Sequence, residues 1–242
     1  MYICPSTFIG RCICAFYIGL RFNAKKCKLF QRKVNYLGRT ISSEGYGIDT
    51  NNIEVVTKLI SCTPSNVNQL RRILGLLGYY RRYINGYSKI AQPHYDLLKK
   101  ENVKGNPKIV KGTTPIQWKP YHQHALERLV TAITTPPLLT YPDFDMPFVL
   151  HIDASTKGLG AGLYQFKENK IRILGYGSRS LSKTEQGYHS SKLEFLALKW
   201  AVCEQFRDYL LYAKHIDVYT DNNPLSYVLS IAKLNATSQR WV

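Results

Sequence analysis

The sequence predicts an α/β protein, in which an α+β, mainly helical N-terminal part precedes a mixed sheet with helices. The N-terminal half contains an apolar stripe of helical spacing, formed by Leu70, Ile73, Leu74 and Leu77. From residue 147 the apolar pattern takes the period of strands, in FVLHIDA, GAGLYQF and IRILGYGS. Residues 100–116 are rich in Lys, Gly, Pro and Thr, and they form the clearest linker between the two patterns.

The N-terminal half is expected to begin with strands and to continue with helices. The alternating stretch KKCKLFQRKVNYLGRTI ends in the turn-like SSEGYG and predicts two short strands. Asp49 is suited to cap a helix through NNIEVVTKLI, which Pro64 ends, and Ser65 starts the next helix. Further helices are expected through HYDLLKK and from about residue 120 to residue 134, before the extended, proline-rich stretch TTPPLLTYPDFDMP.

The C-terminal half predicts a sheet with a helical crossover. Its first three strands are joined by short turns, which favours an antiparallel meander. A long helix is expected from about Lys183 to Tyr212. The fourth strand, IDVYT, follows this helix and should therefore lie parallel to the first strand. A short helix is expected in NNPLSYVLS.

The chain carries a large excess of positive charge. Its 33 basic and 16 acidic side chains give a net charge of +17, and the isoelectric point is about 9.6. The basic residues are spread through folded-looking sequence and form no separate tail. This charge favours nucleic acid as a partner over an uncommitted basic surface.

The cysteines and the apolar segments indicate the compartment. The six cysteines show neither a CxxC pair nor zinc-ligand spacing, so we expect reduced thiols in an intracellular, cytoplasmic or nuclear, protein. Arg11 interrupts the apolar residues 1–20 and leaves a run too short to cross a bilayer. No membrane partner is therefore expected.

Three acidic residues stand where strands and a helix should converge. Asp153 and Asp221 each end an apolar run of strand type, and Glu194 lies on the amphipathic helix between them. Carboxylates held together by a rigid sheet repel each other unless a cation lies between them, and Mg²⁺ prefers oxygen ligands. The alternative is three unrelated, solvated carboxylates. We favour metal-assisted chemistry on a phosphodiester, because the three acids share one predicted edge.

Several long motifs resemble the Pol polyprotein of gypsy-type LTR retrotransposons. They are LRRILGLLGYYRRYINGYSKIAQPHYDLLKK, IQWKPYHQHALERLVTAITTPPLLTYPDFDMPFVLHIDAS, YGSRSLSKTEQGYHSSKLEFLALKWAV and VYTDNNPL. KKCKLFQRKVNYLGRTISSEGYGID resembles the end of the reverse-transcriptase palm. The resemblance covers residues 21–242. It implies a leader and palm remnant at 1–48, a thumb-like helical region at 49–100, a linker and connection at 101–146, and a ribonuclease H-like domain at 147–242.

The resemblance implies a reaction and its ligands. The reaction is hydrolysis of the RNA strand in an RNA–DNA hybrid, which leaves a 3′-hydroxyl and a 5′-phosphate. The cofactor is Mg²⁺ or Mn²⁺, with two ions in an intact site. Asp153 matches the residue that bridges both ions, Glu194 the one that binds an ion and orients water, and Asp221 the ligand at the end of the fourth strand.

Two departures from the family bear on activity. The aromatic-x-Asp-Asp turn of the polymerase is absent, so no polymerase activity is expected of this chain. The family also continues with a strand and a helix that bears a fourth carboxylate, whereas this sequence stops at Val242. We therefore expect impaired hydrolysis, and an open fourth-strand edge that a partner chain can pair with.

Two groups of residues are candidates for contact with nucleic acid. Ser155 and the glycines Gly158, Gly160 and Gly162 follow Asp153, and this stretch either brings backbone close to phosphates or forms a hairpin turn with a bulge, which we favour for Gly160 and Gly162. In the family, the neighbourhood of Arg179 and Tyr188 touches the backbone of the hybrid, and a solvated turn arginine would explain Arg179 equally. The second group interleaves rings with positive charge, in Tyr80, Arg81 and Arg82. Such rings stack on bases while arginines meet phosphates, or the tyrosines simply pack in a core.

Three functions remain open on the sequence. The first is a reverse-transcriptase fragment with ribonuclease H activity, which the three acids favour. The second is a nucleic-acid-binding module without catalysis, and the third is the product of a decayed element. The expected lack of a fourth carboxylate favours the second and third.

Overall fold

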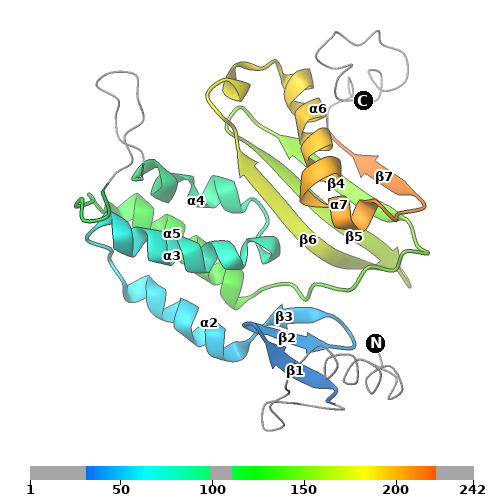
Figure 1. Cartoon of the computed structure of the whole chain (residues 1–242), viewed down its shortest axis with the longest axis horizontal. Helices are drawn as coiled ribbons and strands as arrows, with labels where there is room; N and C mark the ends of the chain where they lie inside the picture. Colours follow the sequence, from blue (N-terminus) through cyan, green and yellow to red (C-terminus); the bar gives the residue numbers. More distant parts are fainter. Residues whose placement is uncertain (1–30, 99–110, 222–242) are drawn as a thin grey trace, which may run out of the picture.

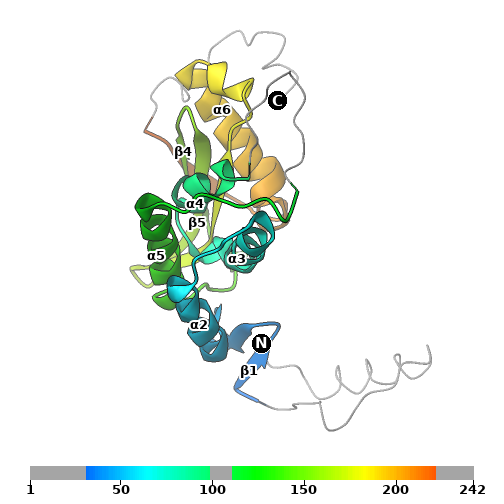
Figure 2. The ribbon, with the colours of Figure 1, turned by 90° about the vertical axis from the view of Figure 1, so that its left-hand side faces the viewer.

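The computed structural model describes residues 31–98 and 111–221. The predicted leader, most of the linker and the helix expected in NNPLSYVLS lie outside these residues. The described chain forms a small sheet, a group of helices and a larger sheet (Figure 1). In the side view the small sheet lies at one end of the molecule and α6 at the other, with the helices between them (Figure 2).

The small sheet is antiparallel and has the order β1-β2-β3. Its strands are β1 (Lys33–Tyr36), β2 (Arg39–Ser42) and β3 (Tyr46–Ile48). The first two strands were predicted, whereas β3 lies in a stretch that was expected to be a turn. Gly45 permits the strand, because its φ is +154° and a Cβ there would collide with the Leu139 carbonyl oxygen. This close backbone approach gives β3 a pairing partner outside its own sheet.

Four helices and two 3₁₀ turns follow the small sheet. They are α2 (Thr50–Thr57), η2 (Lys58–Ser61), α3 (Val67–Tyr79), η3 (Arg81–Tyr83), α4 (Tyr87–Asp96) and α5 (Pro120–Thr134). Asp49 caps α2 as predicted, since its carboxylate accepts the Asn51 N–H at 3.1 Å. The cap of α3 is Asn66 and not Ser65, because the Asn66 side chain accepts the Gln69 N–H.

The larger sheet has the order β6-β5-β4-β7. Its strands are β4 (Phe148–Ala154), β5 (Gly158–Lys167), β6 (Lys170–Ser180) and β7 (Ile216–Tyr219). The first three form the predicted antiparallel meander, and β7 pairs parallel to β4 as the helical crossover requires. Within the described chain, β7 lies at the edge of this sheet.

The prediction of a single long helix before β7 is wrong. The chain instead forms a 3₁₀ turn η4 (Glu185–Gly187), α6 (Ser190–Trp200), a π-helical turn η5 (Ala201–Gln205) and α7 (Arg207–Leu210). Helix α6 begins later than expected, because Ser182 and Glu185 close a local turn. The Glu185 carboxylate accepts the Ser182 N–H, and the Ser182 hydroxyl accepts the Glu185 N–H.

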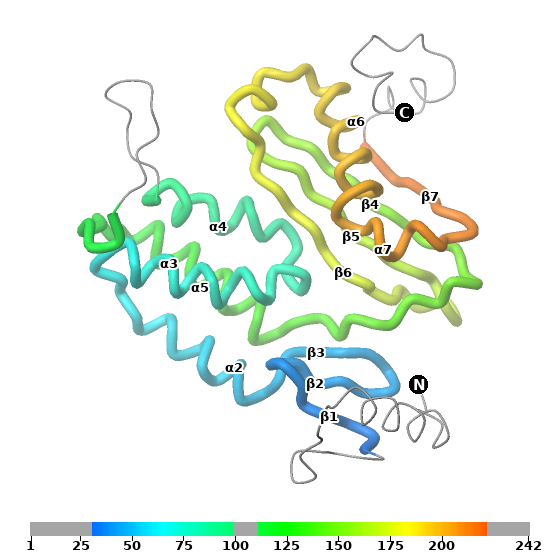
Figure 3. The backbone as a smooth tube through the Cα atoms, viewed as in Figure 1, coloured from blue at the N-terminus to red at the C-terminus, as the bar shows by residue number. Residues whose placement is uncertain are grey.

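Two apolar cores are joined by the segment between α5 and β4. One core lies between the larger sheet and α6, and the other is built from the helices and β3. Leu139 is fully buried in the second core and forms bridges to Tyr46 of β3 and to Ile173 of β6. Figure 3 shows this segment running between β3 and the larger sheet. A single stretch of backbone thus ties the two sheets together.

No helix among the described residues is long and apolar enough to cross a membrane.

Candidate active site

Two of the predicted acids lie at the carboxyl ends of parallel strands. In the β4–β7 pairing, Val149 is opposite Asp217 and His151 is opposite Tyr219. Asp153 follows His151 by two residues within β4, and Asp221 follows Tyr219 by two residues, just beyond the end of β7. Both acids are exposed. The fold therefore brings a pair of carboxylates, 68 positions apart in the sequence, to one edge of the sheet.

The third acid, Glu194, reaches this edge from α6. Its side chain is only 4% exposed, and its carboxylate accepts the Thr220 hydroxyl at 3.2 Å and a backbone hydrogen bond from Ala154. Burial raises the pKa of Glu194, and the charges of Asp221 and Asp153 raise it further, against the lowering effect of the two hydrogen bonds. The three predicted acids thus interact electrostatically at the ends of β4 and β7.

The donor chemistry of this edge suits a hard cation. All three side chains offer carboxylate oxygens, the ligands that Mg²⁺ and Mn²⁺ take, and a cation would relieve the repulsion that raises the Glu194 pKa. Across residues 31–98 and 111–221, no three His, Cys, Asp or Glu side chains are already gathered as a metal-binding group. The donors are therefore of the kind that a hard cation takes.

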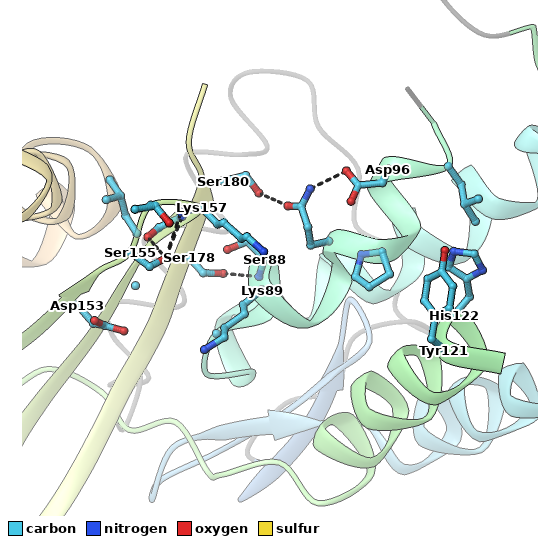
Figure 4. Close-up of a pocket in the computed structure, with 18 residues that line it drawn as sticks. Ser88, Lys89, Asp96, Tyr121, His122, Asp153, Ser155, Lys157, Ser178 and Ser180 are labelled. Atoms are coloured by element: carbon cyan, nitrogen blue, oxygen red, sulfur yellow. Dashed lines mark hydrogen bonds between the residues drawn. The ribbon is translucent and has the colours of Figure 1, made fainter. Parts of the chain in front are cut away.

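Asp153 also lines a cleft of about 680 Å³ between α4 and the larger sheet. One wall is α4, with Ser88, Lys89 and Gln92, and the other side is formed by the β4–β5 turn and the end of β6. In Figure 4, Asp153, Ser155 and Lys157 lie on the sheet side, while Lys89 extends from α4. The helical region and the sheet together make this cleft.

The three residues predicted to meet the hybrid backbone have defined local partners. Ser155 is exposed at the cleft, and its hydroxyl holds the β4–β5 turn by accepting the Gly158 N–H at 3.1 Å. Arg179 donates two hydrogen bonds of 3.0 Å to Glu185, so its guanidinium is already paired. Tyr188 is half-buried and carries the Lys192 ammonium 3.7 Å from its ring centroid. Of these three, only Ser155 lines the cleft.

The basic and aromatic run lies apart from the acids. Tyr80 is 2% exposed and belongs to the helical core, so its ring has no free face for a base. The Arg82 guanidinium lies 5.4 Å from the ring centroid of Tyr209, between the helices and the larger sheet. Arg81 is exposed on η3. The structure therefore leaves Arg81 as the exposed member of this group.

Sequence reasoning missed part of the cleft. Lys89 and Lys157 line it but were not named as site residues, and a hairpin was the favoured interpretation of Gly160. Their one sequence signal was proximity to a motif: Lys157 and Gly160 follow Asp153 within seven residues. Lys89 lies in the motif LRRILGLLGYYRRYINGYSKIAQPHYDLLKK, but it is 64 residues from Asp153 and nothing in the sequence places the two together.

Comparison with known proteins places this chain among retroelement polyproteins. A family profile described as an RNase H-like domain found in reverse transcriptase matches residues 118–218. The retrovirus-related Pol polyprotein from transposon opus of Drosophila melanogaster is 32% identical over 224 residues, which cover 92% of this chain and 22% of that protein. The corresponding polyprotein from transposon gypsy is 31% identical over 229 residues, with 94% and 21% covered. The chain spans about a fifth of the length of these relatives.

Solved structures show the same fold. A foamy viral protease-reverse transcriptase dRH in complex with double-stranded DNA has a TM-score of 0.73 and 22% identity, over 98% of this chain and 39% of that one. The foamy viral protease-reverse transcriptase in complex with an RNA/DNA hybrid has a TM-score of 0.66 and 22% identity, over 90% of this chain and 28% of that one. At this identity the likeness concerns the fold.

Proposed function

Because the chain belongs to the gypsy-type retrotransposon Pol family, in the region that spans the end of the reverse transcriptase and the ribonuclease H-like domain, we propose that it hydrolyses the RNA strand of RNA–DNA hybrids. The observation that supports the proposal is that Asp153 and Asp221 stand at the carboxyl ends of the parallel strands β4 and β7, while the buried Glu194 accepts a hydrogen bond from Thr220 beside Asp221. Ligand sites in sheets of this kind lie at carboxyl ends of strands. The net charge of +17 supports a polyanionic substrate.

The three acids have different tasks in this proposal. Asp153, Glu194 and Asp221 would hold Mg²⁺ or Mn²⁺, which when bound activates a water and stabilises the leaving oxygen. Asp153 faces the cleft, where a phosphodiester has access to it. Glu194 is held by the Thr220 hydroxyl and the Ala154 backbone, so its carboxylate is oriented before substrate arrives. Burial and the neighbouring charges of Asp221 and Asp153 raise the pKa of this carboxyl.

The proposal is tested with a labelled RNA–DNA hybrid and the purified chain. Cleavage is expected with Mg²⁺ or Mn²⁺, and it should disappear in EDTA and in Asp153→Asn. Asp217→Asn is a matched control, because Asp217 lies near the amino-terminal end of β7, opposite Val149, and is paired with His215 at 2.9 Å. Equal cleavage by wild type and Asp153→Asn would contradict the proposal.

Binding without cleavage would favour the second function, a nucleic-acid-binding module. The cleft between α4 and the sheet supports this alternative, because it exposes Lys89 and Lys157 whether or not the acids bind a cation. Salt-sensitive binding of the hybrid by Asp153→Asn as well as by wild type, with no product from either, would be its signature.

A further inference from the structure

The wall of the cleft formed by α4 is fixed to the sheet. The Ser88 backbone N–H donates to the Ser178 hydroxyl at 2.9 Å, and the Ser180 hydroxyl donates to Gln92 Oε1 at 3.1 Å. These bonds join residues that are 90 and 88 positions apart. Because two hydrogen bonds on successive turns of α4 anchor it to β6, the side chain between them, Lys89, is held at the mouth of the cleft.

Two ammonium groups face the cleft from opposite sides. Lys89 projects from α4 and Lys157 from the β4–β5 turn, and both residues are exposed. Within the described ranges neither ammonium forms an ion pair. The two ammonium groups line the same cleft as the carboxylates of Asp153 and Asp96, and Asp96 accepts a hydrogen bond from Gln92. The ammonium groups offer the cleft contacts for a chain that carries a negative charge at each repeat.

The floor of the cleft is open next to Asp153. Gly160 pairs with Asp153 across β4 and β5 and lines the same cleft. A Cβ built on Gly160 would meet only the Asp153 carbonyl oxygen at 3.8 Å and its Cβ at 3.9 Å, which is ordinary contact. The fold therefore tolerates a side chain at this position, and its absence leaves room directly beside the acid.

We propose that this cleft holds the sugar-phosphate backbone of the cleaved strand, with Lys89 binding a phosphate next to the one at Asp153 and Gly160 giving the backbone clearance. The inference rests on the proposed hydrolysis and deepens it, because it makes the helical region part of the substrate site. Lys157 contacts the same backbone from the sheet side. Lys89 is a substrate-binding residue in this arrangement, whereas Arg179 stabilises the turn at Glu185 through two hydrogen bonds.

The test measures binding of a fluorescently labelled RNA–DNA hybrid to the full chain in EDTA, by anisotropy, over a series of salt concentrations. Lys89→Ala is expected to bind about tenfold more weakly and to reduce the slope of log affinity against log salt by about one. Lys170→Ala is the matched control, because Lys170 is exposed at the opposite end of β6. It should leave the slope within error of wild type.

Gly160→Val provides a second variant that leaves the charge unchanged. It should weaken hybrid binding but leave the slope of log affinity against log salt unchanged. The added side chain fills space beside Asp153, whereas the number of positive charges stays the same. Its thermal midpoint should stay close to that of wild type, since the Cβ position is open.

The outcomes separate this inference from the proposed hydrolysis. Unchanged affinity and slope in Lys89→Ala would overturn the cleft assignment even if the wild type cleaves the hybrid. Weaker binding by Lys89→Ala, with no cleavage by any variant, would support the cleft and overturn the hydrolysis. Absence of hybrid binding by wild type would overturn both.

Discussion

The Thr220 hydroxyl donates a hydrogen bond to a carboxylate oxygen of Glu194 at 3.2 Å. Thr220 directly follows β7 and Glu194 belongs to α6, so this bond joins the two elements that supply the second and third acids. It also lowers the pKa of Glu194, against burial and the two neighbouring carboxylates, which raise it.

Thr220→Val should raise the pKa of Glu194 further. The substitution removes the hydroxyl that stabilises the charged carboxylate but keeps the β-branched shape. The measurement is a pH titration of the Glu194 side-chain carboxyl by NMR. Thr40→Val is the control, because the Thr40 hydroxyl bonds only Asn35 on the small sheet. A Glu194 pKa equal in wild type and Thr220→Val would contradict the assigned role.

Glu194→Gln should stabilise the fold at neutral pH while it abolishes cleavage. An acid with a raised pKa in the folded state binds more protons folded than unfolded, so its contribution to stability declines as the pH rises above its usual pKa of 4.5. Glutamine keeps the hydrogen-bonding shape without the charge. Urea unfolding at pH 7 should show a higher midpoint for Glu194→Gln, and at pH 4 the difference should shrink. A variant less stable at pH 7 would refute this reasoning.

The Arg179–Glu185 pair should stabilise the turn before α6. Two 3.0 Å hydrogen bonds from Arg179, followed by bonds from Ser182, lower the Glu185 pKa to about 2. A carboxyl group whose pKa is lowered in the folded state stabilises the fold above its unfolded pKa of about 4.5. This stabilisation is lost as the pH falls towards 2. Arg179→Ala should cost about 1 kcal/mol at pH 7.

Arg179→Lys tests the geometry of the same pair. A lysine keeps the charge but cannot form both bonds, so it should recover only part of the lost stability. Chemical denaturation at pH 7 and pH 2 measures both variants. Equal losses for Arg179→Ala at the two pH values would show that the ion pair is not the cause.

His94 should make the helical core sensitive to acid. The ring is 1% exposed, its Nε2–H donates to the His122 carbonyl at 2.9 Å, and its Nδ1 is buried without a partner. Burial lowers the pKa of His94 below its usual 6.5. The unfolded chain therefore binds the proton first, and stability should fall as the pH drops below 6.5. Denaturation midpoints between pH 7.5 and pH 5.5 measure this fall, and His94→Gln should flatten it.

Leu139 should be essential for joining the two cores. It is fully buried between β3 and β6, so Leu139→Ala should cost about 2–5 kcal/mol. Its neighbour Leu138 is 47% exposed, and Leu138→Ala should change stability by under about 1 kcal/mol. Urea denaturation compares the two variants. Similar losses at both positions would contradict the role given to Leu139.

Local patterns predicted most elements because they report on neighbouring residues. The stripe from Leu70 to Leu77 is buried on α3, and the strand periodicity after residue 147 corresponds to β4, β5 and β6. The prediction failed where side chains compete with the backbone. Glu185 closes a turn where helix was expected, and Gly45 permits a strand where a turn was expected.

The sequence by itself determined most of the strands and helices, the excess of positive charge, and the placement of Asp153 and Asp221 after strand-like runs with Glu194 on a helix between them. These are properties of local periodicity and composition. Only the tertiary structure decided that Tyr80 is buried, that Arg179 is paired with Glu185, and that Lys89 shares a cleft with Asp153. The physical reason is that burial, pairing and cleft shape depend on contacts between distant segments, such as the 90 positions between Ser88 and Ser178, which no local pattern records.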